Sequence, residues 1–382
     1  MSTVAVKPKH RFAGRARVVV RALARRAASI GVRRPPHDPQ RILIAHHLLL
    51  GDTLMLTPLL AKLREQHPSA EIVMALPEPY APLYAAAPYG VKAIGWNPSR
   101  PGESPLWRQG GFDLALIAGD NRFAWLALAL GSRWIVAFDG DHAPVLKRWP
   151  IDEWRNYSAT PAAWGDMVAA LVDGPAPARY DRQDWPNPSA AYVNLPSRPY
   201  AVLHVGASTP LKLWDPIRWR ALATRLSAQG VVPVWSADRG EMDIIRACDP
   251  GGLYRSFAGA LTLTQLWTLI AHAALLVAPD TGVAHLGRII GTPTIALFGP
   301  GSSTIAGGGE FWRHAAFRAV TVDPFPCRDQ RVLFKREIAW ARRCGRTIAE
   351  CAHPKCMDAI ELDRVIGAIE ELRGAKRLDE HS

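Results

Sequence analysis

The stretch Leu275-Leu276-Val277-Ala278-Pro279-Asp280-Thr281-Gly282-Val283-Ala284-His285 joins a short apolar run directly to the start of a helix. The first four residues are all apolar, which is typical of a strand buried on both faces of a parallel sheet. Asp280 and Thr281 follow after Pro279, and Gly282 lets the backbone turn tightly. The order predicts one unit of an α/β fold, with polar side chains at the carboxyl end of a strand.

Apolar runs and helical stretches alternate in the same way on both sides of this unit. Strands separated by helices predict parallel sheets with helices on both faces. We expect strands at 41–45, 70–76, 112–117, 134–138, 200–205, 231–235, 275–278 and 294–298. We expect helices at 57–66, 219–229, 261–271 and 360–372.

The alternation is interrupted once, between residues 173 and 199, where six prolines fall among few periodic apolar residues. Such a segment is typical of a linker. The sequence therefore predicts two Rossmann-like domains facing a central cleft. The expected division is a basic N-terminal arm (1–39), an N-terminal domain (40–172), the Pro-rich linker (173–199), a C-terminal domain (200–357), and a terminal helix with its tail (358–382).

The charge is concentrated at the N-terminus. The net charge is +12, and residues 1–40 contribute ten basic residues against one acidic residue. Arg17, Arg21 and Arg25 share one side of a possible helix, which suits an anionic membrane surface. A disordered basic tail is the alternative, and no nucleic-acid motif supports a nucleic-acid arm. Arginines interrupt every run long enough for a signal peptide, and no apolar run is long enough to span a bilayer.

The chain has five cysteines, and four of them lie near the C-terminus: Cys327, Cys344, Cys351 and Cys356. An odd, clustered set argues against a disulfide framework and favours a reducing, cytoplasmic setting. Four thiols within 30 residues could hold structural Zn²⁺ or iron, although the spacing is not that of a zinc ribbon. Reduced structural thiols without metal are the other interpretation.

Asp52 follows the expected strand 41–45 in the sequence Leu50-Gly51-Asp52-Thr53. A carboxylate at this strand end would face the cleft, where it could deprotonate a hydroxyl. An aspartate before a helix is also a common N-cap, so a purely structural role stays open.

A second polar turn, Gly206-Ala207-Ser208-Thr209-Pro210-Leu211-Lys212, follows the strand at 200–205. Hydroxyls and an ammonium suit phosphate oxygens, although a solvated surface turn would have the same composition. The third turn is Asp280 to His285. Free N–H groups at the start of its helix would suit a diphosphate, and His285 could donate to it or pack against the sheet.

In this order, Leu-Gly-Asp, the hydroxyl-rich turn with Lys and Trp, and Asp-Thr-Gly-x-x-His followed by Phe-Gly-Pro resemble glycosyltransferase family 9, the ADP-heptose lipopolysaccharide heptosyltransferases. The resemblance covers roughly residues 41–372. It implies a GT-B fold and an inverting mechanism that requires no cofactor. It also implies that the N-terminal domain binds the acceptor and the C-terminal domain binds the nucleotide-sugar donor.

The resemblance assigns a role to each candidate residue. Asp52 matches the general base, and Lys212 matches the lysine that stabilises the leaving diphosphate, with Ser208 and Thr209 beside it. Asp280, Thr281, Gly282 and His285 match the donor-binding motif, and Glu241 matches the acid that holds the nucleotide ribose. The first loop, His46-His47-Leu48-Leu49-Leu50, departs from the family pattern, which often has serines there.

We therefore expect an enzyme that moves a sugar, heptose by resemblance, from an ADP-activated donor to a lipopolysaccharide core or related glycan. It would work in the cytoplasm, with the inner membrane face as a possible location. The alternatives are a transferase with another donor or a protein acceptor, and a catalytically silent GT-B module that binds nucleotide-sugar or glycolipid. An NAD(P) oxidoreductase is disfavoured, because no Gly-x-Gly-x-x-Gly follows either first strand.

Overall fold

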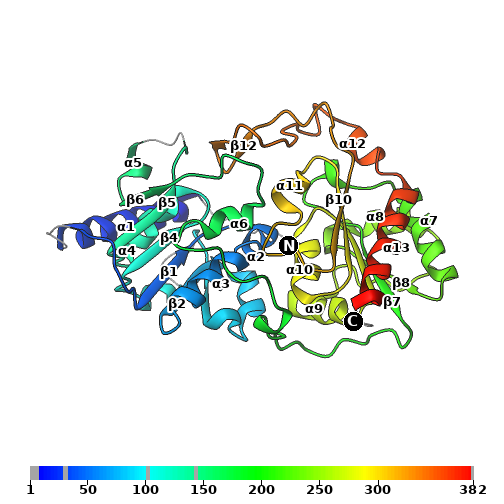
Figure 1. Ribbon diagram of the computed structural model, residues 1–382, viewed down its shortest axis with the longest axis horizontal. Coiled ribbons are helices and arrows are strands. Elements are labelled where there is room, and N and C mark those ends of the chain that lie inside the picture. Colours follow the sequence, from blue (N-terminus) through cyan, green and yellow to red (C-terminus); the bar gives the residue numbers. More distant parts are fainter. Residues whose placement is uncertain (1–7, 29–32, 100–103, 142–144, 380–382) are drawn as a thin grey trace.

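The computed structural model describes residues 8–28, 33–99, 104–141 and 145–379. Residues 1–7 and 29–32 of the expected basic arm, and 380–382 of the tail, lie outside the described residues. The chain forms two α/β halves side by side, one in the blue to green part of the sequence and one in the green to red part (Figure 1). A parallel sheet forms the centre of each half.

The first sheet has the order β3-β2-β1-β4-β5-β6, and every neighbouring pair in it is parallel. Its strands are β1 (Arg41–Ala45), β2 (Glu71–Pro77), β3 (Val91–Trp96), β4 (Leu114–Ile117), β5 (Trp134–Phe138) and β6 (Glu153–Arg155). The chain moves outward from β1 to β3 and then returns to the other side of β1. Such a reversal places a binding crevice beside the carboxyl end of β1.

The second sheet has the order β11-β10-β9-β7-β8 and is also parallel throughout. Its strands are β7 (Tyr200–His204), β8 (Val232–Ser236), β9 (Leu275–Pro279), β10 (Thr294–Phe298) and β11 (Phe317–Thr321). The reversal here lies between β7 and β9, and these two strands precede the loops of Lys212 and Asp280.

Helices cover both sheets (Figure 1). They are α1 (Pro8–Ala28), α2 (Leu50–Leu54), α3 (Thr57–Gln66), α4 (Ala124–Ala129), α5 (Val145–Arg148), α6 (Trp164–Ala169), α7 (Pro216–Ala228), α8 (Met242–Cys248), α9 (Leu263–Ala271), α10 (Gly282–Ile290), α11 (Ser303–Ala306), α12 (Lys355–Asp358) and α13 (Leu362–Asp379). The expected fold class, α/β with two Rossmann-like domains, is confirmed.

Within the two parallel sheets, the strands that the sequence did not predict are β3, β6 and β11, and each lies at a sheet edge. In β3 and β11 the side chains of Lys92 and Arg318 are exposed. An edge strand carries polar residues because part of it faces solvent, so it lacks the continuous apolar run of a central strand.

The N-terminal segment is helical where it is described. Helix α1 packs against α4, at the end of the N-terminal half farthest from the second sheet (Figure 1). Arg21 donates to the carbonyl of Ala129 at 3.2 Å and lies over the ring of Trp107. The structure therefore shows a helix at residues 8–28, and the contact of this helix with a membrane stays a prediction.

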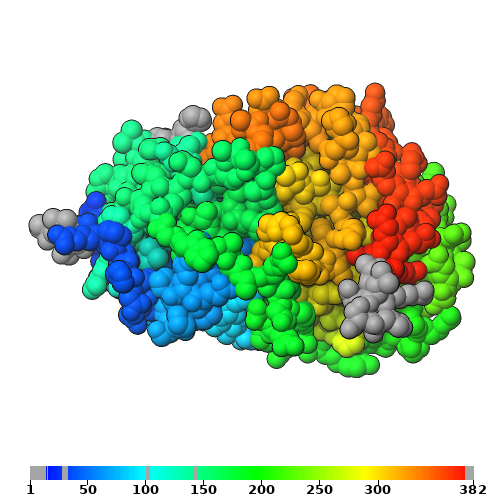
Figure 2. Space-filling model, viewed as in Figure 1, coloured from blue at the N-terminus to red at the C-terminus, as the bar shows by residue number. Residues whose placement is uncertain are grey.

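The Pro-rich segment is bound to both halves. Trp185, at its centre, is fully buried and packs against Tyr84 of the first half and Trp267 of the second. Arg182 donates to the carbonyl of Ile290 at 2.7 Å. The two halves therefore share one continuous apolar core, and Figure 2 shows them in broad contact.

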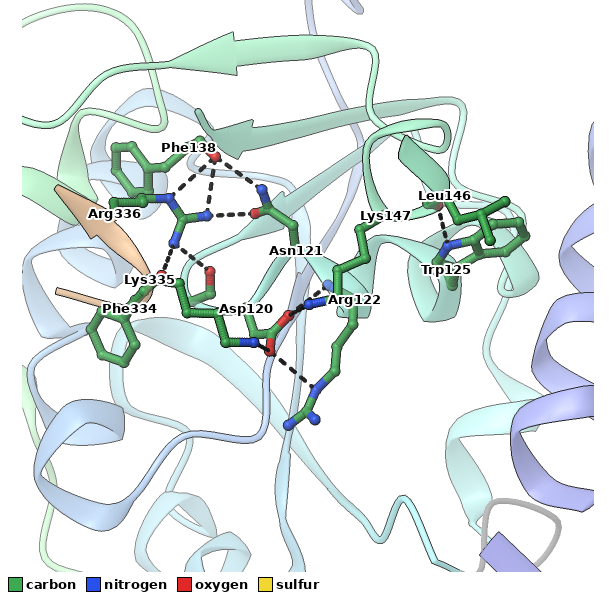
Figure 3. Close-up of polar contacts among 11 residues, drawn as sticks. Asp120, Asn121, Arg122, Trp125, Phe138, Leu146, Lys147, Phe334, Lys335 and Arg336 are labelled. Atoms are coloured by element: carbon green, nitrogen blue, oxygen red, sulfur yellow. Dashed lines mark hydrogen bonds and ion pairs between the residues drawn. The ribbon is translucent and has the colours of Figure 1, made fainter. Parts of the chain in front are cut away.

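Residues 322–359, which we call the cysteine segment, form a second connection between the halves. The segment leaves β11 and reaches the first half through the hairpin of β12 (Val332–Leu333) and β13 (Arg336–Glu337). Arg336 is 1% exposed, and its guanidinium donates to the carbonyls of Phe138, at 3.0 Å, and Gly119, at 3.1 Å, and to Asn121 Oδ1 at 2.7 Å (Figure 3). Lys335 forms an ion pair with Asp120 at 2.9 Å.

Candidate functional site

The carboxyl ends of β1 and β9 face each other across the boundary between the halves. Helix α2, which follows β1, packs against α10, which follows β9. The contact is close because glycines form it. A Cβ on Gly51 would lie 2.9 Å from the ring of His285, and a Cβ on Gly282 would lie 2.9 Å from the side chain of Leu50. Asp52 is thereby brought beside the Asp280 to His285 turn.

Asp52 is half-buried in the first turn of α2 and makes no cap hydrogen bond, since Leu49 occupies the N-cap position. Burial, the larger cause, and the nearby Asp280 carboxylate together raise the pKa of Asp52 to about 6. The positive charges of Lys212 and Arg343 partly offset this rise in the pKa of Asp52. A carboxylate with this pKa is a stronger base than an ordinary aspartate and is still mostly ionised at neutral pH.

Lys212 and Asp280 form an ion pair at the topological reversal of the second sheet. Lys212 lies at the end of a short 3-10 turn (Pro210–Lys212) after β7, and its Nζ donates to Asp280 Oδ2 at 2.8 Å and to the Asp280 carbonyl at 2.7 Å. Gly301 permits the loop after β10 to approach the same carboxylate, because a Cβ there would lie 2.2 Å from Oδ2. The ammonium is held beside Asp52 and the start of α10.

The start of α10 has polar groups without protein partners. Thr281 takes the N-cap position in extended conformation, but its side chain makes no cap hydrogen bond. The Thr281 hydroxyl is buried, and within the described part of the chain it has no hydrogen-bond partner. A buried hydroxyl at a helix N-terminus suits an anionic ligand, which would also meet the positive end of the helix dipole.

His285 is 3% exposed in the first turns of α10. Arg288 Nη2 lies 3.0 Å from His285 Nδ1. A guanidinium can only donate, so Nδ1 is the acceptor and the ring proton lies on Nε2. Burial lowers the pKa of His285 well below its usual range, and the charges of Arg288 and Lys212 lower it further. His285 is therefore a neutral imidazole that packs against α2 and has Nε2–H as its ring donor, and its role toward a diphosphate stays a prediction.

The remaining donor-side candidates cluster after β7 and β8. Ser208 is exposed, and Thr209 caps the turn that carries Lys212. The carboxylate of Glu241 accepts from the N–H groups of Ala207, at 2.9 Å, and Asp238, at 2.8 Å. These two hydrogen bonds connect the loop after β7 to the loop after β8. The loops approach closely because residue 206 is glycine: a Cβ there would lie 1.8 Å from Glu241 Oε2. The oxygens of Glu241 keep free lone pairs for a further donor.

Sequence reasoning missed two arginines of this site. Arg288 is 2% exposed, and burial lowers its pKa to about 9 against the opposing effect of Asp166 of the first half. Its guanidinium donates to the Gly307 carbonyl and lies over the ring of Trp312 at 4.4 Å. Arg343, in the cysteine segment, lowers the pKa of Asp52. An arginine within the apolar stretch of α10 was the available signal for Arg288; nothing local singled out Arg343 among its neighbours.

The four C-terminal cysteines are free thiols. Burial, the largest cause, and the neighbouring Cys327 and Cys344 together raise the pKa of Cys356 to about 11. The Cys351 thiol donates to the carbonyl of His353 at 3.5 Å. In the described residues no three His, Cys, Asp or Glu side chains are grouped so that they could hold a metal ion. The four cysteines are therefore not brought together as a metal site in this structure.

The chain is similar to several characterised proteins. The model of glycosyltransferase family 9 (heptosyltransferase) matches residues 107–308. Lipopolysaccharide heptosyltransferase 1 of Pseudomonas aeruginosa is 26% identical over 288 residues, which cover 68% of this chain and 79% of the relative. Lipopolysaccharide heptosyltransferase 3 of Escherichia coli is 24% identical over 318 residues, which cover 74% of this chain and 89% of the relative.

Among solved structures, the E. coli ADP-heptose lipopolysaccharide heptosyltransferase II superposes with a TM-score of 0.64 at 20% identity, over 90% of this chain and 100% of that one. The paired sheets, with polar turns facing each other at their carboxyl ends, are thus the GT-B architecture, and the class is that of the glycosyltransferases. Within that class, the family model and both relatives named above are heptosyltransferases. The chain belongs to glycosyltransferase family 9.

Proposed function

We propose that this glycosyltransferase moves a heptose, with inversion, from an ADP-activated donor to a lipopolysaccharide core or a related surface glycan. The observation that carries the proposal is the half-buried Asp52, whose pKa is raised to about 6 where α2 meets the Lys212–Asp280 pair. The relatives named above, lipopolysaccharide heptosyltransferases, support the donor and the acceptor.

The positions of Asp52 and of the Lys212–Asp280 pair suggest how the sugar is transferred. Asp52 takes the proton from an acceptor hydroxyl as its oxygen attacks the anomeric carbon of the donor. The bond from that carbon to the diphosphate oxygen breaks in the same displacement, so the sugar changes configuration and the nucleoside diphosphate leaves as an anion. Attack and departure occur on opposite faces of the sugar, which fits a base on one domain and a diphosphate site on the other.

The departing charge needs stabilisation, and the C-terminal domain supplies it. The Lys212 ammonium, the Thr281 hydroxyl and the free N–H groups of α10 offer donors to the diphosphate, and His285 adds Nε2–H. These donors are held in place before the reaction, so they stabilise developing charge at little reorganisation cost. Glu241, with Ser208 and Thr209 nearby, would bind the ribose and the phosphates of the donor.

The test is sugar transfer from ADP-heptose to a heptose-free core acceptor, with UDP-glucose and GDP-mannose as competing donors. We expect product with inverted anomeric configuration from ADP-heptose alone. Product from another donor would reassign the sugar. Tight ADP binding without transfer to any acceptor would instead identify a silent nucleotide-sugar-binding module.

We also propose that the outer end of the N-terminal half rests on an anionic membrane surface. Val20 and Leu23 of α1 and Val145 and Leu146 of α5 are exposed. The two helices are adjacent, because Arg26 of α1 lies over Trp149, directly after α5. Exposed basic residues on the same helix, among them Arg17, complement anionic lipid.

Flotation with phosphatidylglycerol vesicles tests this surface. Val20→Asp with Leu23→Asp should abolish binding, whereas a change of Leu253, a more exposed apolar residue on the other domain, to Asp should leave it intact. Equal binding to neutral phosphatidylcholine vesicles would argue against the charge complementarity. No described helix is long and apolar enough to cross a bilayer.

A further inference from the structure

Three free thiols of the cysteine segment lie beside one turn of the C-terminal half, Gly299-Pro300, which directly follows β10. A Cβ on Gly299 would lie 3.4 Å from Cys356 Sγ, so this thiol packs against the turn. The backbone N–H of Cys344 donates to the Pro300 carbonyl at 2.9 Å. Cys327 and Cys344 are near enough to Cys356 for their charges to act on its pKa. The three thiols therefore form one cluster beside the turn.

Arg346 contacts two of these cysteines. Its backbone N–H donates to Cys344 Sγ at 3.5 Å, and its guanidinium donates to the Cys327 carbonyl at 2.5 Å. Both cysteines are partly exposed, and Arg343 directly precedes Cys344. Reactive cysteines are found in such electropositive, partly exposed surroundings, whereas buried structural cysteines are inert. Cys344, with an arginine on either side, has the surroundings of a thiol that reacts with oxidants.

The other two cysteines of the segment are less suited to react. Cys356 is 4% exposed, and burial is the main cause that raises its pKa to about 11, so it stays protonated at neutral pH. The Cys351 thiol is engaged elsewhere, because it donates to the carbonyl of His353 at 3.5 Å. Cys327 and Cys344 are therefore the pair that chemistry favours.

The backbone at both members of this pair is attached to the Gly299-Pro300 turn. Arg328, which directly follows Cys327, donates from Nε to the Gly299 carbonyl at 2.7 Å. Cys344 donates to the next carbonyl, that of Pro300. A covalent bond between the two sulfurs would therefore pull on both attachments and displace the turn.

The turn adjoins the proposed diphosphate site. Gly301 follows Pro300, and a Cβ on Gly301 would collide with Asp280 Oδ2. The same carboxylate oxygen accepts from Lys212 Nζ at 2.8 Å. Because the contact between the turn and Asp280 leaves no free space, a displacement of the turn moves the carboxylate and the ammonium paired with it.

We propose that Cys327 and Cys344 form an oxidative modification site, at which a peroxide converts the two thiols into a disulfide that weakens the donor site. The thiolate sulfur of Cys344 attacks one peroxide oxygen, the O–O bond breaks, hydroxide leaves, and the sulfur becomes a sulfenic acid. The Cys327 sulfur then attacks the Cys344 sulfur, the S–O bond breaks, and a second hydroxide leaves. The two thiol protons convert both hydroxides to water, and the peroxide is reduced by two electrons.

This chemistry needs two sulfurs and no metal ion. No three ligating side chains are grouped for a metal ion in the described part of the chain, but a disulfide joins only two thiols. In a reducing compartment such disulfides are transient and act in redox sensing. The modification goes beyond the proposed sugar transfer, and only its effect on donor binding rests on that function.

Peptide mapping of the full chain tests the disulfide without any sugar transfer. The reduced protein is treated with hydrogen peroxide, the remaining thiols are alkylated, and the peptides are analysed by mass spectrometry. We expect a link between the peptides of Cys327 and Cys344 in the wild type and in C351S, which removes another thiol of the same segment. The link should be lost in C344S. A link that joins Cys351 or Cys356 instead, or no link at all, would overturn the site.

Calorimetric titration with ADP tests the effect on the donor site. We expect the oxidised wild type and oxidised C351S to bind ADP about 10-fold more weakly than their reduced forms, the loss of one charge-assisted contact. Dithiothreitol should restore the affinity, and C344S should bind ADP equally before and after peroxide. A disulfide that leaves ADP affinity unchanged would overturn the effect on the donor site. Absence of ADP binding in every form would overturn the proposed transferase function and leave the mapped disulfide intact.

Discussion

Arg288 Nη2 donates to His285 Nδ1 over 3.0 Å, between two residues one turn apart on the buried helix α10. The contact fixes the proton of the imidazole on Nε2, the nitrogen available to a ligand. The Nε–H group of Arg288 is buried and has no partner in the described chain. The arginine therefore occupies the core at a cost in desolvation, which indicates a positioning role beyond stability.

Replacing Arg288 with Met should release His285 from its single tautomer and raise the pKa of the imidazole, because a nearby positive charge is removed. Long-range ¹H–¹⁵N NMR of histidine-labelled protein measures both quantities. Arg288→Gln keeps a donor to Nδ1 and should restore the Nε2–H form. Arg220→Met, which removes contacts to the carbonyls of Ala247 and Cys248, serves as a control. An Nδ1–H tautomer in the wild type would contradict the assignment.

Asp52→Asn should lower kcat by about 100-fold or more, with little change in ADP affinity, because the base is lost and the donor site is kept. In the wild type, kcat/KM should fall as the pH drops through about 6, where Asp52 takes up its proton. Asp363→Asn, an exposed carboxylate on α13, is the matched control. Equal turnover of D52N and wild type would remove Asp52 from the mechanism.

The raised pKa of Asp52 also has a consequence for stability. The folded state binds the Asp52 proton more tightly than the unfolded chain, so this contribution to stability is present at low pH and is lost as the pH rises through about 6. Asp52→Asn should therefore raise Tm more at pH 8 than at pH 5, as measured by calorimetry. A Tm difference independent of pH would mean that Asp52 is not desolvated.

Lys212 and Asp280 act on the pKa of Asp52 with opposite signs. Lys212→Met should move the acidic limb of the kcat/KM profile to higher pH, and Asp280→Asn should move it to lower pH. Lys212→Met should also weaken ADP binding, since it removes the ammonium from the diphosphate site. Shifts in the same direction for both variants would show that the limb belongs to another group.

Arg336→Met should lower the free energy of unfolding by about 2–4 kcal/mol, because it leaves the carbonyls of Phe138 and Gly119 and the Asn121 side chain without a buried donor. Lys335→Met removes the adjacent exposed ion pair with Asp120 and should cost less than about 1 kcal/mol. Urea denaturation measures both. Similar losses for the two variants would argue against a docked cysteine segment.

The sequence by itself determined the central strands and the turns after them. Runs such as 41–45 and 294–298 were predicted with their observed bounds, because a strand buried on both faces leaves an unbroken apolar pattern. The edge strands β3, β6 and β11 were missed, since their partly solvated faces break that pattern, whereas the edge strand β8 was predicted. Asp52, Lys212 and Asp280 were found because the carboxyl ends of parallel strands are where ligands bind.

Only the tertiary structure decided how these turns meet. The approach of α2 to α10 depends on the missing side chains of Gly51 and Gly282, and its geometry appears only when both halves are packed. The pKa of Asp52 depends on burial and on charges more than a hundred residues away. The positions of Arg288 and of the thiols beside the Gly299-Pro300 turn likewise arise from contacts between distant parts of the chain, for which local sequence carries no periodic signal.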